Sequence, residues 1–98
     1  MANSERSANF LMESRLRDAE RGNPNAYFDL GVAYSTGSGG VEVNMIEAHK
    51  WFNLAALNGN EEAMYCRAEI SDEMTAREIA EAQRQARAWL QMSERRAA

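Results

Sequence analysis

The chain has 98 residues, of which 45% are hydrophobic and 27% charged, so it has the length and composition of one small globular domain. A single proline and the lack of any alternating polar–apolar run argue against a β-rich fold and favour an all-α one. The one cysteine, Cys66, excludes an intramolecular disulfide, and no apolar run reaches the length of a membrane span.

The net charge of −4 is unevenly distributed along the chain. Residues 1–22 balance four basic against four acidic side chains, residues 23–74 carry two basic and eight acidic ones, and residues 75–98 carry five arginines and three glutamates. An acidic middle argues against nucleic acid as a partner, because phosphate contacts need a basic surface. It favours a protein partner that offers a basic or mixed surface.

The first predicted helix covers residues 5–21 and carries Met12, Leu16 and Ala19 on one face. We interpret it as an N-terminal capping helix that covers the next unit of the chain. The first nine residues lack the basic and then apolar pattern of a secretion signal, so we expect a cytoplasmic protein.

Residues 23–59 read as a helix–loop–helix unit. Asn23 is a typical N-cap for the first helix, and Gly37 occupies the position of its C-cap. Asn44 is the expected N-cap of the second helix, which Gly59 ends. Apolar and small residues recur at helical spacing in both helices: Ala26, Leu30, Ala33 and Tyr34, then Ala48, Trp51, Phe52, Ala55 and Ala56.

Residues 60–95 predict a second helical pair. Asn60 is a good N-cap for its first helix, and Thr75 with Glu78 forms a capping-box pattern for a last helix running toward Glu94. The predicted inner faces consist of Ala63, Cys66, Arg67 and Ile70, then Ile79, Ala82, Ala86, Trp89 and Leu90.

The two units repeat one another. Gly22 and Asn23 are matched by Gly59 and Asn60, 37 residues later, and residues 48–52 are matched by residues 86–90, 38 residues later. Periods of this length with one helical pair each are typical of an α-solenoid.

The two helical units resemble a known family, the Sel-one-like repeat (SLR), which is related to the tetratricopeptide repeat. One good repeat covers about residues 23–59, and a degenerate one covers about residues 60–95, where Arg67 and Ser71 stand in the positions of Leu30 and Tyr34. The residues that carry the resemblance are Ala26, Leu30, Gly31, Tyr34, Gly37, Gly39, Val41, Ala48, Trp51, Phe52, Ala55, Ala56 and Gly59. The resemblance implies an α-α superhelix of about five antiparallel helices that acts as a binding scaffold, with no catalytic residues and no cofactor.

Few residues suggest a phosphate-binding, metal-binding or catalytic site. The glycines of residues 37–40 lack the lysine and the preceding strand of a phosphate-binding loop, so we interpret them as a turn. His49 lies one step off the apolar stripe and is expected on the surface or in a groove, without the companions of a metal site. Cys66 is expected to behave as a small hydrophobic residue. A nucleophilic Cys66–His49 pair, as in a small cysteine-dependent hydrolase, is a remote alternative to the prediction that the chain is not an enzyme.

In tetratricopeptide-like units the first helix of each pair lines the concave surface, and this resemblance implies a partner-binding groove. Phe28, Val32 and Tyr65 would be its apolar anchors, and Glu62, Glu69 and Asp72 would select a basic or amphipathic segment. The repeat offset gives the expected groove-facing positions as Asn25, Phe28, Val32, Ser35 and Thr36 in the first unit and Glu62, Tyr65, Glu69, Asp72 and Glu73 in the second, and the residues chosen for partner binding are these without Thr36 and Glu73.

Two questions stay open at this stage. Phe28 and Val32 either face the groove or are buried under the helix of residues 5–21. The chain is predicted to be a protein-interaction or adaptor module, and the alternative is a structural protein that forms homodimers through its terminal helices, with Leu90 and Met92 in the contact.

Overall fold

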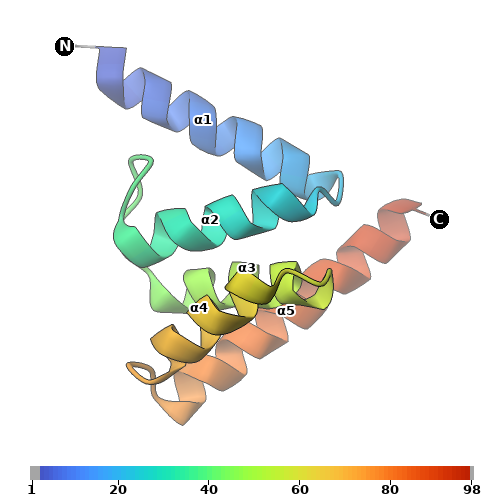
Figure 1. The fold of residues 1–98 in the computed structure, drawn as a ribbon. Coiled ribbons are helices and arrows are strands. Elements are labelled where there is room, and N and C mark those ends of the chain that lie inside the picture. The colour runs from blue at the N-terminus through green and yellow to red at the C-terminus, as the bar shows by residue number, and fades with distance from the viewer. Residues whose placement is uncertain (1–2, 98) are drawn as a thin grey trace.

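The computed structural model describes residues 3–97, together with the side chains of residues 9–95, and within this part of the chain there are five helices and no strand. Their order and bounds are α1 (Asn3–Glu20), α2 (Pro24–Thr36), α3 (Met45–Leu57), α4 (Glu61–Ser71) and α5 (Ala76–Ala97). The prediction of an all-α helical-repeat fold is confirmed. Figure 1 shows α1 at one end of the stack of helices and α4 with α5 at the other.

The predicted caps begin the helices. The side chains of Asn23, Asn44 and Asn60 each accept a hydrogen bond from a backbone N–H two or three residues later, at 3.0, 3.1 and 2.9 Å. Thr75 and Glu78 form the complete capping box: the Glu78 N–H donates to Thr75 Oγ1 at 3.1 Å, and the Thr75 N–H donates to Glu78 Oε1 at 2.8 Å. The helix starts are therefore fixed by local sequence.

The break between α2 and α3 begins at a glycine that the backbone requires. Gly37 has φ of 75°, in the left-handed region, and its N–H donates to the carbonyl of Ala33 at 2.9 Å. The loop that follows brings Val41 back onto the core. This arrangement sets α2 and α3 side by side as a helical hairpin.

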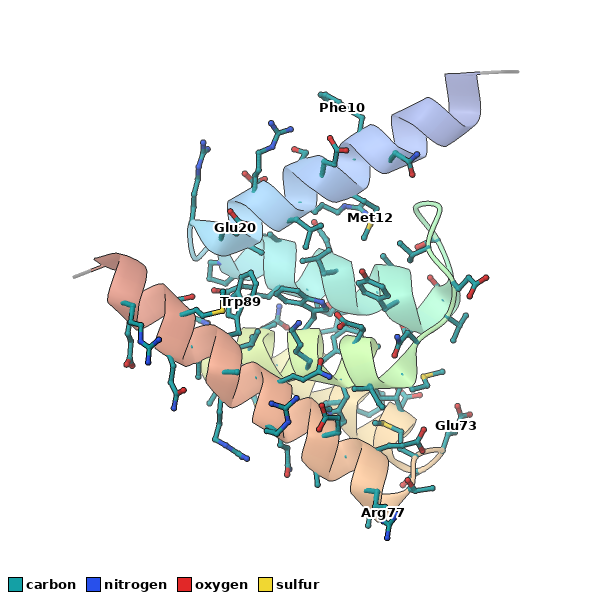
Figure 2. All side chains as sticks on the ribbon, turned by 180° about the vertical axis from the view of Figure 1, so that it is seen from behind. Phe10, Met12, Glu20, Glu73, Arg77 and Trp89 are labelled. Carbon is teal, nitrogen blue, oxygen red and sulfur yellow. The ribbon has the colours of Figure 1, made fainter. Side chains whose placement is uncertain are left out.

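Helix α3 is the centre of the molecule, because α2, α4 and α5 all pack against it, while α1 packs on the other side of α2. Trp51 is fully buried and has an aromatic ring on either side of it. The Tyr27 ring stacks at 6.0 Å between centroids, and the Trp89 ring of α5 meets it edge to face at 4.9 Å. Figure 2 shows the Trp89 side chain directed into the body of the molecule from α5.

The expectation of a surface or groove position for His49 is wrong. Only 2% of this residue is exposed, and Leu54, also outside the predicted stripe, is fully buried. Three helices surround α3, so a wider sector of its circumference is covered than one apolar stripe indicates.

Helix α4 has polar residues at two positions where α2 has apolar or aromatic ones. Arg67 takes the position of Leu30, and its guanidinium donates to Asn53 Oδ1 of α3 at 2.6 Å. Ser71 takes the position of Tyr34 and donates to the backbone carbonyl of Arg67 at 2.7 Å. Helix α4 is consequently held to α3 by few large apolar side chains.

The last helix is longer than predicted. The sequence indicated a helix running toward Glu94, whereas α5 continues to Ala97. Among the residues described, none of the helices has both the length and the apolar character needed to cross a membrane.

Candidate partner-binding groove

A groove with a volume of about 380 Å³ lies between α2 and α4, and its floor is formed by α3. We call it the α2–α4 groove. Its walls come from the first helix of each helical pair, as the resemblance to tetratricopeptide-like units implied. The lining residues are Val32, Ser35, Thr36, Met45, Phe52, Cys66, Glu69, Ile70 and Glu73.

The floor depends on one glycine. A Cβ atom at Gly31 would lie 2.5 Å from Cδ1 of Phe52, so only glycine lets the Phe52 ring approach α2 this closely. Phe28, three residues before Gly31, packs on the same ring with 5.7 Å between centroids. The groove therefore has an aromatic floor that continues into the hydrophobic core.

The structure brings some of the expected groove residues together and leaves others apart. Val32, Ser35 and Glu69 line the α2–α4 groove, and half-buried Phe28 packs on the Phe52 floor. Tyr65 is 70% exposed. The remaining expected residues are exposed and do not line the cavity: Asn25, Glu62 and Asp72.

One wall of the groove is acidic. Glu69 on α4 and Glu73 in the turn after it are exposed, and neither makes an ion pair among the described side chains. Figure 2 shows Glu73 at the turn between α4 and α5. The carboxylates of Glu62 and Glu69 also act on Cys66, whose thiol pKa is raised first by burial and then by these two charges.

Cations that could neutralise this wall are held elsewhere. Between residues 23 and 74 the only basic side chains are Lys50 and Arg67. Arg67 donates to Asn53, and Lys50 lies 3.6 Å from Glu47 and 4.6 Å from the centre of the Trp51 ring. Neither Lys50 nor Arg67 therefore pairs with the carboxylates of the acidic wall, which face solvent.

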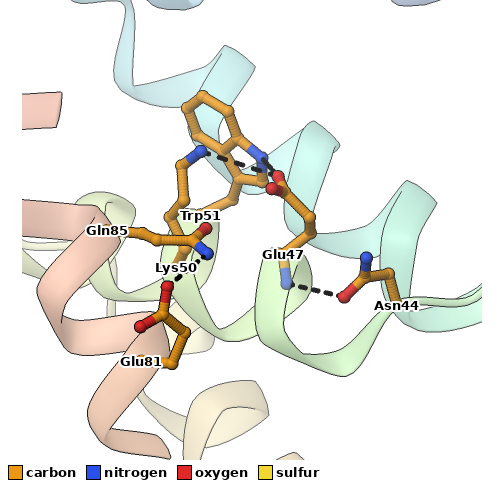
Figure 3. A network of polar contacts seen from close by, with 6 residues as sticks. All are labelled: Asn44, Glu47, Lys50, Trp51, Glu81 and Gln85. Atoms are coloured by element: carbon orange, nitrogen blue, oxygen red, sulfur yellow. Dashed lines mark hydrogen bonds and ion pairs between the residues drawn. The ribbon is translucent and has the colours of Figure 1, made fainter. Parts of the chain in front are cut away.

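Figure 3 shows what holds Lys50 on the side of α3 that faces α5. The Trp51 indole donates to Glu47 Oε2 at 3.0 Å, and the Lys50 ammonium approaches the same carboxylate. Across from them on α5, Gln85 donates to Glu81 at 3.1 Å. A second hollow of about 230 Å³ lies between α3 and α5 and is lined by Lys50, Arg84, Gln85, Ala88, Trp89 and Met92.

The hydroxyl groups in the groove are partly engaged. Ser35 Oγ donates to the carbonyl of Val32 at 3.1 Å, and Thr36 Oγ1 donates to the same carbonyl at 2.7 Å. Their oxygens keep lone pairs that can accept a hydrogen bond from a partner's N–H group. The α2 wall therefore offers acceptors, and the α4 wall offers carboxylates.

Cys66 lies in the groove under conditions that oppose nucleophilic chemistry. A reactive cysteine needs a lowered thiol pKa, and that of Cys66 is raised. Burial, and secondly the charge of Arg67, lower the pKa of His49, whose Nδ1 has no hydrogen-bond partner among the described residues. Within residues that the structure describes, no group of three potential ligands is placed to hold a metal ion.

Sequence reasoning missed most of the groove floor. Phe52 was assigned to the core stripe, and Met45 was not assigned to any surface. Cys66 and Ile70 were placed on the inner face of their helix, yet both line the cavity. The signal available in the sequence was Gly31, a helical glycine that permits a close approach from a neighbouring helix.

Comparison with known families identifies one match. The family model of the Sel1 repeat matches residues 24–60, a segment that runs from the start of α2 to the N-cap of α4. No curated protein and no solved structure shows a significant match to the chain.

Proposed function

Because residues 24–60 form a Sel1 repeat, a unit that generally mediates protein–protein interaction, we propose that this chain is a non-enzymatic binding module. Its α2–α4 groove takes a basic, amphipathic segment of a partner protein. The observation that carries this proposal is an aromatic and aliphatic floor beside glutamates that have no ion-pair partner among the described side chains.

The chemistry of the groove defines what the partner segment must contain. An apolar side chain covers Phe52 and Ile70, and so removes apolar surface from water. A lysine or arginine of the segment meets Glu69 at the end of α4 or Glu73 in the turn after it, both of which line the groove. Backbone N–H groups of the segment donate to the free lone pairs of the Ser35 and Thr36 oxygens.

The two parts of the groove have separate roles. The apolar floor supplies most of the binding free energy, because contacts between exposed charges in water are individually weak. The carboxylates orient the segment, accelerate encounter with basic partners and reject acidic ones. Salt therefore reduces the association rate more than it reduces the lifetime of the complex.

The test is a capture experiment with the immobilised chain and a lysate of the source organism. The double variant Glu69→Lys, Glu73→Lys reverses the acidic wall at two exposed positions and leaves the floor intact. The control Glu13→Lys, Glu42→Lys changes the net charge by the same amount at exposed positions on α1 and in the α2–α3 loop. Circular dichroism checks that both variants keep their helical content.

We expect a partner that binds the wild type and the control and is lost with the wall variant. Peptides that span the partner's sequence then locate the bound segment, which is expected to be basic and amphipathic. A partner that the wall variant retains, or a bound segment that is acidic, would show that the groove proposal is wrong.

A further inference from the structure

Helix α5 carries a row of arginines on its exposed surface. Arg84, Arg87 and Arg95 are exposed, and Arg84 and Arg95 lie eleven residues apart, which is three helical turns and about 16 Å. We call these three residues the arginine row. Among the described side chains Arg87 and Arg95 make no ion pair, whereas Arg84 is paired with Glu81 at 2.6 Å.

Helix α4 and the turn after it carry an acidic row. Glu62 and Glu69 lie seven residues apart on α4, which is about two helical turns, Glu73 follows in the turn into α5, and all three are exposed. These three residues are the acidic row, and none of them makes an ion pair among the described side chains. Two of its members lie at the edge of the α2–α4 groove.

The two rows are complementary when the helices run antiparallel. With Glu62 opposite Arg95, Glu69 lies opposite Arg87 to within one residue, and Glu73, in the turn after α4, lies toward Arg84. In the parallel direction with Glu62 opposite Arg84, Glu69 would instead lie opposite Gln91. The antiparallel alignment therefore places a glutamate near each arginine.

An apolar side chain completes the match. Met92 lies three residues before Arg95 and so on the same face of α5, and 46% of it is exposed. Its position among the arginines gives α5 the basic and apolar pattern that the groove requires. The flexible thioether of methionine adapts well to an irregular apolar floor such as that around Ile70.

The two rows do not satisfy each other within one molecule. Helix α5 packs against α3, and the charges of both rows face solvent. Residues 23–74 carry a formal charge of −6 and residues 75–98 one of +2, so two copies attract through unlike regions.

We propose that the α2–α4 groove binds α5 of a second copy of this chain, with the arginine row of one copy antiparallel to the acidic row of the other. The inference rests on the proposed function and deepens it, because it names the basic, amphipathic segment. The contact is between unlike surfaces, so each copy has one groove and one α5 available for association. A foreign partner of the groove then competes with self-association.

The test is sedimentation equilibrium of the full chain over a range of protein concentrations. One variant reverses the acidic row by Glu62→Lys, Glu69→Lys, and the other reverses the arginine row by Arg87→Glu, Arg95→Glu. Arg84 is left unchanged because its pairing with Glu81 belongs to α5 itself. Control variants with the same charge changes are Glu13→Lys, Glu42→Lys and Arg17→Glu, Arg21→Glu, all at exposed positions.

We expect the wild type and both controls to self-associate, and each reversed variant to show a dissociation constant raised at least about tenfold. An equimolar mixture of the two reversed variants restores association, because the groove of each is again opposite in charge to α5 of the other. Wild-type association weakens when salt is raised from about 0.05 to about 0.3 M.

Three outcomes would overturn the inference: a wild type that stays monomeric, reversed variants that associate like their controls, or a mixture that fails to restore association. Each is distinguishable from failure of the proposed function, which is read from capture of a foreign partner. A monomeric wild type whose groove still captures a basic segment refutes self-association alone. Self-association through another surface, with no groove-dependent capture, refutes both.

Discussion

The rings of Trp51 and Trp89 meet edge to face with 4.9 Å between their centroids. Trp51 belongs to α3 and Trp89 to α5, so the contact joins the second helices of neighbouring helical pairs. The Lys50 ammonium lies over both rings, at 4.6 and 5.6 Å from their centres. One aromatic pair and one cation therefore connect α3 to α5.

Trp89→Ala should lower the free energy of unfolding by about 3 kcal/mol, because it removes the aromatic contact and leaves a cavity beside Trp51. Trp89→Phe should cost less, because the Trp89 indole N–H has no hydrogen-bond partner among the described residues. Trp51→Phe is the matched comparison, since it also loses the bond to Glu47 and should cost about 1 kcal/mol more than Trp89→Phe. Urea denaturation measures all three, and equal costs for the two Phe variants would contradict this account.

Gly31→Ala should destabilise the protein by about 1–2 kcal/mol, although alanine is the better helix former. The new Cβ would lie 2.5 Å from the Phe52 ring and force it out of its position. Ala68 holds the equivalent position in the second repeat and is exposed, so Ala68→Gly should cost only the helix propensity of about 1 kcal/mol. Thermal and urea unfolding test this, and a stabilised Gly31→Ala variant would show that Phe52 moves without cost.

The stability of the protein should fall as the pH drops below about 6.5, the ordinary pKa of histidine. Burial, and then Arg67 of α4, lower the pKa of His49, so the folded protein keeps this imidazole neutral. The unfolded chain takes up a proton at higher pH than the folded one, and the stabilisation present above the unfolded pKa is lost on acidification.

Unfolding free energies measured between about pH 5 and pH 7.5 test this effect. His49→Gln should flatten the slope over this interval, whatever its effect on stability at pH 7.5. Glu81, whose folded-state pKa the hydrogen bond from Arg84 lowers to about 2, contributes to the pH dependence below its ordinary pKa of about 4.5, beneath most of this window. A slope that persists in His49→Gln would assign it to another group.

Alkylation of Cys66 by iodoacetamide near pH 8 should be slower than that of a free cysteine. Burial and the carboxylates of Glu62 and Glu69 raise the thiol pKa, so less of the reactive thiolate is present. Glu69→Gln should accelerate the reaction, whereas Glu13→Gln on α1 should not. Alkylation faster than that of the free amino acid would support the alternative that the chain is a cysteine-dependent hydrolase.

Local signals made the helices predictable from sequence. Asn23, Asn44, Asn60 and Thr75 act through hydrogen bonds within three residues, so no knowledge of the tertiary fold is needed to interpret them. The spacing of Trp51 and Phe52 likewise identified core positions. Burial of His49 could not be predicted in this way, because it depends on how many helices surround α3.

The groove was predictable only in part. Repeat offset placed Val32, Ser35 and Glu69 on one surface, because equivalent positions of stacked helices face the same side. Repeat offset could not predict that Met45 and Phe52 line the groove, since both belong to α3 behind it. They reach the cavity because their side chains are large. Repeat offset also does not indicate whether an exposed residue such as Tyr65 lines the cavity.

Phe52 has two structural roles, since its ring is buried in the core and also forms the floor of the groove. A substitution that reshapes the floor also disturbs Gly31 and Phe28, so changes in ligand preference at this position carry a folding defect. Exposed Thr36, Glu69 and Glu73 have no such constraint. Descendants of this protein can therefore acquire new partners most readily by altering the rim, while the floor is inherited unchanged.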